Sequence, residues 1–174
     1  SEEEKIVEDL RREVKRLAER VKELIETSKK LVEDSKRHVK DLARRLRDII
    51  RKLKKDLRDK GPTEDLKRKV DKVLEEAARE IKKHLDKNKE LLERDERVVR
   101  DVERRLRELL KKVEDRGVER RALEELEKVV REIRRELERV HEETRRVIEE
   151  SNRELEEILR EAKELLEEVK KEAE

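Results

Sequence analysis

Serine, aspartate and histidine, the side chains of a hydrolytic triad, all occur in this chain. Ser28, Asp95 and His141 each interrupt an otherwise aliphatic helical pattern. A hydrolase needs an accessible nucleophile, free donors for an oxyanion and a substrate cleft. Backbone N–H groups inside a helix are already bonded, and a narrow helical core leaves no space of ligand size. We therefore interpret the three residues as structural and expect no enzymatic activity.

The three histidines are also candidate metal ligands. His84 and Asn88 share one helix face, but asparagine is a poor ligand for zinc. His38 is expected to approach His84, whereas His141 is expected about 12 Å away along the helix axis. The sequence therefore predicts no metal site, and no other cofactor.

Breaks in the helical pattern define the elements that position these side chains. Gly61 suits the left-handed position after a helix, Pro62 cannot continue one, and Thr63 can cap the next. Gly117 marks a second break, without a capping residue after it. These signals predict helices over about 2–60, 63–116 and 118–174.

The apolar residues of each segment recur with a helical period. The register of Ile6 returns at Leu24 and at Leu42, so the pattern repeats every 18 residues. This corresponds to about 3.6 residues per turn, the period of a straight helix, whereas a heptad repeat would impose supercoiling. Short connections make neighbouring helices antiparallel. We therefore predict an all-α fold, a single domain that forms a long, nearly straight, antiparallel up-down-up three-helix bundle.

Polar residues replace apolar ones in the middle of each helical stripe. An unpaired buried polar group costs about 1–3 kcal/mol, so such residues are tolerated only in mutually satisfied sets. A set of this kind favours one alignment of otherwise repetitive helices. The sequence predicts one buried structural network, formed by Ser28, Ser35, His38, His84, Asn88, Asp95, His141, Thr144, Ser151 and Asn152.

The two breaks indicate which of these residues lie at the same level. Folding the chain at both breaks places Ser28 level with Asp95 and close to His141. It places Ser35 level with Asn88 and close to Thr144. Polar positions that were identified separately in three helices therefore fall at common heights, which scattered substitutions would rarely do.

Composition limits the function classes. Charged residues make up 60% of the chain, hydrophobic residues 32%, and Phe, Trp, Tyr, Met and Cys are absent. The 53 basic and 51 acidic residues nearly balance, so we expect no bulk attraction to nucleic acid or to an anionic membrane. No apolar run approaches the roughly 20 residues that span a bilayer. Without a visible targeting signal the localisation is unknown, and a soluble protein, cytoplasmic on recombinant expression, is expected.

Mirrored segments, a Glu/Lys/Arg surface, an aliphatic core and grouped polar core residues occur together here. In this combination the whole chain resembles de novo designed, parametrically generated helical bundles. The resemblance implies a scaffold or assembly component without a native biological role. It also implies deliberate buried hydrogen-bond networks, which such designs commonly carry.

Two roles fit this reading. The first is a monomeric scaffold that requires no partner, which we favour. The second is a binding module, either the three-helix part of a split four-helix assembly or a homo-oligomer subunit. His38 and Asn152 lie off the centres of their stripes and distinguish the two, because outward-facing side chains could meet a partner helix. Buried histidines would also resist protonation, so stability is expected to fall below about pH 6.

Overall fold

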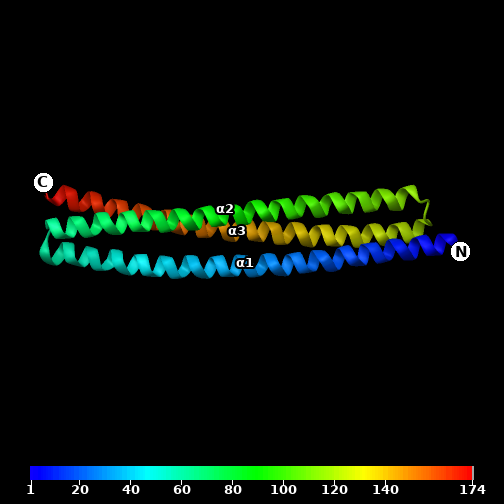
Figure 1. Ribbon diagram of the computed structural model, residues 1–174, viewed down its shortest axis with the longest axis horizontal. Helices are drawn as coiled ribbons and strands as arrows, with labels where there is room; N and C mark the ends of the chain where they lie inside the picture. Colours follow the sequence, from blue (N-terminus) through cyan, green and yellow to red (C-terminus); the bar gives the residue numbers. More distant parts are fainter. Residues whose placement is uncertain (174) are drawn as a thin grey trace. The chain divides into compact units, whose positions relative to one another are not determined.

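The computed structural model describes residues 1–173, and nearly all of them are helical. Helix α1 spans Glu2–Lys60, α2 spans Glu64–Asp115 and α3 spans Arg120–Ala173 (Figure 1). The described residues contain no strand. The predicted all-α class with three helices is therefore confirmed.

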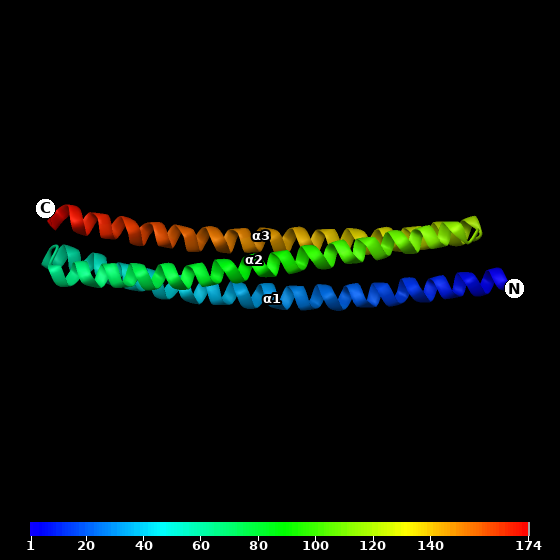
Figure 2. The same ribbon diagram turned by 45° about the horizontal axis from the view of Figure 1, so that its top comes forward.

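The connection between α1 and α2 follows from its local sequence. Gly61 adopts a φ of 76°, in the left-handed region that residues with a Cβ rarely enter. Its N–H donates to the Leu57 carbonyl at 3.0 Å, and Thr63 Oγ1 accepts the N–H of Leu66 at 3.1 Å. Both ends are thus capped, and a tight turn results (Figures 1 and 2).

The start of α3 differs from the prediction, because the helix begins at Arg120 instead of residue 118. Gly117 has a φ of 62°, and the next residue, Val118, is 9% exposed and packs into the core. The Glu119 N–H donates to a carboxylate oxygen of Glu3 at 3.1 Å. A side chain from α1 therefore satisfies this helix start, which has no capping residue of its own.

Contacts divide the chain into two compact units, and each contains a part of every helix. Unit 1 comprises Ser1–Leu31 and Leu91–Arg146. Unit 2 comprises Val32–Glu90 and residues 147–173. In each unit, segments that are distant in sequence complete a separate core.

The hydrophobic side chains in the core of unit 1 are all aliphatic. Burying each side chain of this kind contributes about 1.5–3 kcal/mol, which makes the apolar stripes the main source of stability. An ion pair between Glu13 and Lys112, at 2.9 Å, and the contact of Ser28 with Asp95, at 2.8 Å, show that α1 and α2 run antiparallel here. The most buried residues of this core include Leu10, Val21, Leu106, Val113 and Leu126.

Unit 2 has an aliphatic core of the same kind. An ion pair between Arg47 and Glu154, at 3.0 Å, joins α1 to α3 along its edge. The most buried core residues come from all three helices, and include Val39, Leu46, Val70, Ile81, Leu155 and Ile158.

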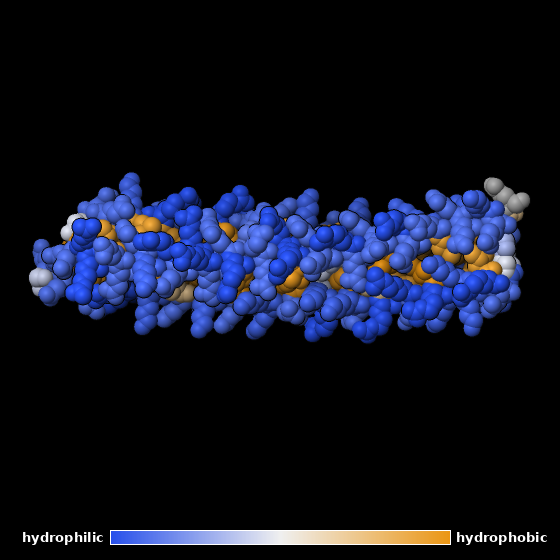
Figure 3. All heavy atoms as spheres, turned by 180° about the vertical axis from the view of Figure 1, so that it is seen from behind, coloured by the Kyte–Doolittle hydropathy of each residue, from blue (hydrophilic) through white to orange (hydrophobic). Residues whose placement is uncertain are grey.

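Charged side chains dominate the surface. Figure 3 shows one face, on which apolar residues are visible only as narrow strips among hydrophilic ones. Among the described residues no large hydrophobic side chain is exposed. None of the described helices carries an apolar stretch that would let it cross a membrane.

Candidate functional site: the polar core residues

Three polar side chains of unit 1, one from each helix, meet at Asp95. The Ser28 hydroxyl donates to Asp95 Oδ1 at 2.8 Å, and His141 Nδ1 lies 2.5 Å from Asp95 Oδ2. A carboxylate oxygen accepts, so Nδ1–H is the donor in the second bond. The Asp95 side chain is 11% exposed and that of His141 is 21% exposed. We call these residues the first triad.

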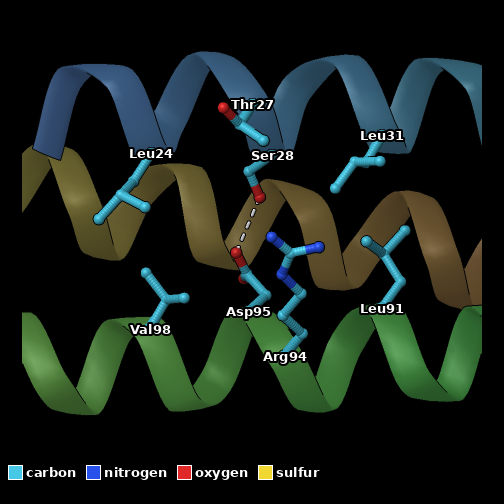
Figure 4. A pocket seen from close by; sticks show the side chains of 8 residues that line it. All are labelled: Leu24, Thr27, Ser28, Leu31, Leu91, Arg94, Asp95 and Val98. Atoms are coloured by element: carbon cyan, nitrogen blue, oxygen red, sulfur yellow. Dashed lines mark hydrogen bonds between the residues drawn. The ribbon is translucent and has the colours of Figure 1, made fainter. Parts of the chain in front are cut away.

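Aliphatic side chains shield the Ser28–Asp95 bond. They lie about one helical turn to either side of it on α1 and α2, while the Thr27 hydroxyl donates to the Glu23 carbonyl of its own helix at 3.0 Å. Partial shielding from water strengthens a hydrogen bond of this kind. The four shielding residues, drawn in Figure 4, are Leu24, Leu31, Leu91 and Val98.

The order of the first triad differs from that of a hydrolase. In a hydrolytic triad the histidine lies between serine and aspartate and takes the serine proton. Here Asp95 lies between Ser28 and His141, and among the described residues no hydrogen bond joins those two. The space beside the Ser28–Asp95 bond has a volume of about 40 Å³, which suits a water molecule and not a substrate. The hydrogen bonds therefore do not pair Ser28 with a histidine, as a hydrolytic triad requires.

A second triad lies in unit 2 and is centred on Asn88. The Ser35 hydroxyl donates to Asn88 Oδ1 at 2.5 Å, and Asn88 Nδ2 donates to Asn152 Oδ1 at 2.8 Å. Asn88 is 1% exposed, so its amide depends on these two partners. The hydrogen bonds therefore form two separate triads in place of the single predicted network.

The histidines of unit 2 belong to neither triad. His38 is exposed, so its predicted burial is wrong. It lies about 80° from the centre of the α1 stripe at 100° per residue, which turns it out of the core. His84 is half-buried and lines the same cleft as His38. Neither imidazole forms a hydrogen bond with another described residue.

Electrostatics in that cleft act on His84. Burial, followed by the positive charges of Lys87, His38 and Lys83, lowers the pKa of His84, and the carboxylate of Glu80 opposes this only in part. Lys83 and Lys87 are not among the predicted network residues. Lys87 follows His84 by three residues, a spacing that places both on one helix face and could have indicated this interaction.

The other two predicted residues are buried without joining a triad. Thr144 is 4% exposed in unit 1, and Ser151 is 8% exposed in unit 2. Within the described residues neither bonds to a triad member, and no side-chain nitrogen or oxygen fully shielded from solvent lacks a partner. No three His, Asp or Glu side chains of the described chain converge as a metal site would require.

Comparisons with known proteins identify no family. No protein-family model matches the chain, and no curated protein matches it. A solved structure described as "Computationally designed three helix bundle" is 19% identical, with 99% of this chain and 84% of that chain covered. Its TM-score is 0.41, so the similarity carries no inference about function.

Proposed function

We propose that this protein is a designed structural scaffold without a native biological role, in which the two triads favour one pairing of repetitive helices. The observation that carries this proposal is that each triad takes one residue from each helix. In both, a residue of α2 stands between a serine of α1 and a residue of α3. Such a set is complete only when the three helices meet in one alignment.

The apolar stripes alone do not enforce that alignment. Their period lets a helix move by one turn, about 5.4 Å, or pair with a helix of another chain, while aliphatic side chains still meet. Either change would leave Asn88 buried without its partners at a cost of about 1–3 kcal/mol. The Asp95 carboxylate would lose both of its hydrogen-bond donors, and leaving a buried charge without partners costs more free energy than leaving a neutral amide without them. The triads therefore serve specificity, and the aliphatic cores supply most of the stability.

Core composition supports a designed origin. Every buried hydrophobic residue in the described part of the chain is Leu, Ile, Val or Ala. Natural cores of this size normally include aromatic residues, which bury large areas. A core limited to aliphatic residues with well-defined rotamers is a choice typical of design.

A variant without triads tests the proposed role. It combines Ser28→Ala, Asp95→Leu and His141→Leu with Ser35→Ala, Asn88→Leu and Asn152→Leu. We expect the free energy of unfolding to stay equal or to rise, because apolar residues replace polar ones. We also expect several masses by light scattering, or doubled resonances in the amide NMR spectrum. A single species with one set of resonances would show that the triads do not control specificity.

We also propose that the protein acts as a monomer. Asn152 has its partner, Asn88, in the same chain, and no large hydrophobic side chain of the described residues is exposed. The outward position of His38 would suit contact with a partner helix. However, His38 lines a cleft together with His84 of the same chain, so no partner helix is needed to explain its position. Light scattering after size-exclusion chromatography tests this, with a mass near 21.2 kDa expected. A multiple of that mass would instead support an assembly module.

A further inference from the structure

A cleft of about 340 Å³ lies between α1 and α2 in unit 2. His38 and Asp41 line it from α1, and Lys83, His84 and Lys87 line it from α2. The histidines come from different helices, and the lysines are one helical turn apart on α2. Together with Arg45, five nitrogen-bearing side chains thus share one small concave surface.

The unpaired charges of this cleft are mainly positive. Arg45 and Glu80, which also line it, form an ion pair with each other. Neither Lys83 nor Lys87 forms an ion pair with another described residue, and Asp41 is the one remaining acidic group in the lining. The pKa of His84 agrees with this count, because burial lowers it most and the positive neighbours lower it by more than Glu80 raises it.

We propose that this cleft binds a small tetrahedral oxyanion, such as sulfate or a phosphate group, through Lys83, Lys87, His38 and His84. Each lysine ammonium offers three donors, and each protonated imidazole offers two. Charge-assisted hydrogen bonds to an oxyanion are among the stronger polar contacts in proteins. The two lysines supply fixed charge, whereas the two imidazoles supply charge that depends on pH.

A metal ion is disfavoured at the same place. The cleft offers two imidazoles, but no third ligand converges with them among the described residues. The ammonium groups of Lys83 and Lys87, which disfavour a proton on His84, would also repel a divalent cation. The chemistry of the lining therefore selects an anion.

Acidification should strengthen binding. The imidazole of His84 gains a positive charge as the pH falls, and it does so at a lower pH than usual because burial and neighbouring positive charges lower its pKa. By linkage, a bound dianion raises the pKa of His84. We expect affinity to be about tenfold weaker at pH 8 than at pH 5.5, since positive charge next to the anion is lost.

Sulfate is a suitable probe, because its charge does not change over this pH range. The experiment follows the imidazole resonances by NMR during titration with sodium sulfate at constant ionic strength. We expect saturable shifts of His38 and His84 at pH 5.5, with His141 of unit 1 as an unaffected internal reference. Equal shifts of all three histidines would indicate general ionic effects and overturn the proposal.

Two double variants complete the test. Lys83→Gln with Lys87→Gln, both exposed helix positions, should abolish saturation and raise the pKa of His84. The matched control is Arg105→Gln with Lys112→Gln in a cleft of about 280 Å³ in unit 1, which Glu13 and Glu108 also line. This control removes the same charge and should leave the sulfate response unchanged. Unchanged binding in the first variant, or saturation by zinc chloride but not by sulfate, would refute the proposal.

Discussion

Asn88 on α2 donates from its amide nitrogen to the amide oxygen of Asn152 on α3 across 2.8 Å. The bond joins residues that are 64 positions apart in the sequence, and the donor is almost inaccessible to water. Water cannot replace a lost partner at such a site without opening the core. The contact is thus more informative about alignment than about net stability.

Replacing Asn88 with alanine should be costly. The change removes the partner of both Ser35 and Asn152 and leaves a small void, so we expect a loss of about 1–3 kcal/mol in the free energy of unfolding. Chemical denaturation measures this. For comparison, Leu155→Ala, at a fully buried aliphatic site, should cost about 2–5 kcal/mol. A denaturation midpoint of Asn88→Ala equal to that of the parent would contradict the triad as described.

Asp95 should determine the tautomer of His141. The carboxylate accepts from Nδ1, so neutral His141 should carry its proton there, which ring nitrogen shifts in NMR can report. Asp95→Asn puts an amide NH2 group where one carboxylate oxygen was, and a ring nitrogen facing that group must accept. We expect the proton to move to Nε2 and stability to fall by about 1 kcal/mol. Finding Nδ1–H in both proteins would argue against the contact.

Stability should fall on acidification because of His84. Its pKa is lowered in the folded protein, so between the unfolded value near 6.5 and the lower folded value the unfolded chain binds more protons. The stability contribution of neutral His84 is therefore complete above pH 6.5 and is lost as the pH falls through the folded pKa. Denaturation midpoints at pH 7.5 and pH 5 should differ, with the lower one at pH 5. His84→Gln should reduce that difference, and a difference that persists unchanged would assign it to other groups.

Gly61→Ala tests the turn between α1 and α2. Nothing lies within 4 Å of an added Cβ, so the cost comes from the backbone alone, at a φ of 76°. We expect a loss of about 1 kcal/mol, since left-handed conformations disfavour residues with a Cβ. Thermal unfolding provides the measurement, and Asp59→Ala, at an exposed position near the end of α1, is a control that should have little effect. A stabilised Gly61→Ala variant would contradict the assigned geometry.

The ends of α1 and α2 and the pairing of these two helices were predictable from the sequence, because local chemistry determines them. Gly61 and Gly117 both adopt the left-handed conformation that their positions at helix ends indicated. Ser28 and Ser35 bond to the α2 residues placed level with them, because a short turn leaves two antiparallel helices little freedom in their alignment. The apolar period was sufficient to define the helices.

The features that were not predicted depend on contacts between residues distant in sequence or on the direction in which a side chain faces. The start of α3 is satisfied by Glu3, a residue that is distant in sequence and carries no local signal. Asn88 meets Asn152 instead of Thr144, a partner that the levels estimated from the two breaks did not indicate. His38 is exposed because of its angular position around the helix, whereas the levels estimated from the two breaks describe only its position along the helix axis.

Both triads are centred on α2, and this gives the three helices unequal freedom to vary. Asp95 and Asn88 must each satisfy two neighbours at once, whereas the serines of α1 satisfy one. In a library that randomises all triad positions, selection for folding would therefore accept few residue types at 88 and 95. It would accept more at 28 and 35. The diversity that survives selection would be lowest in α2.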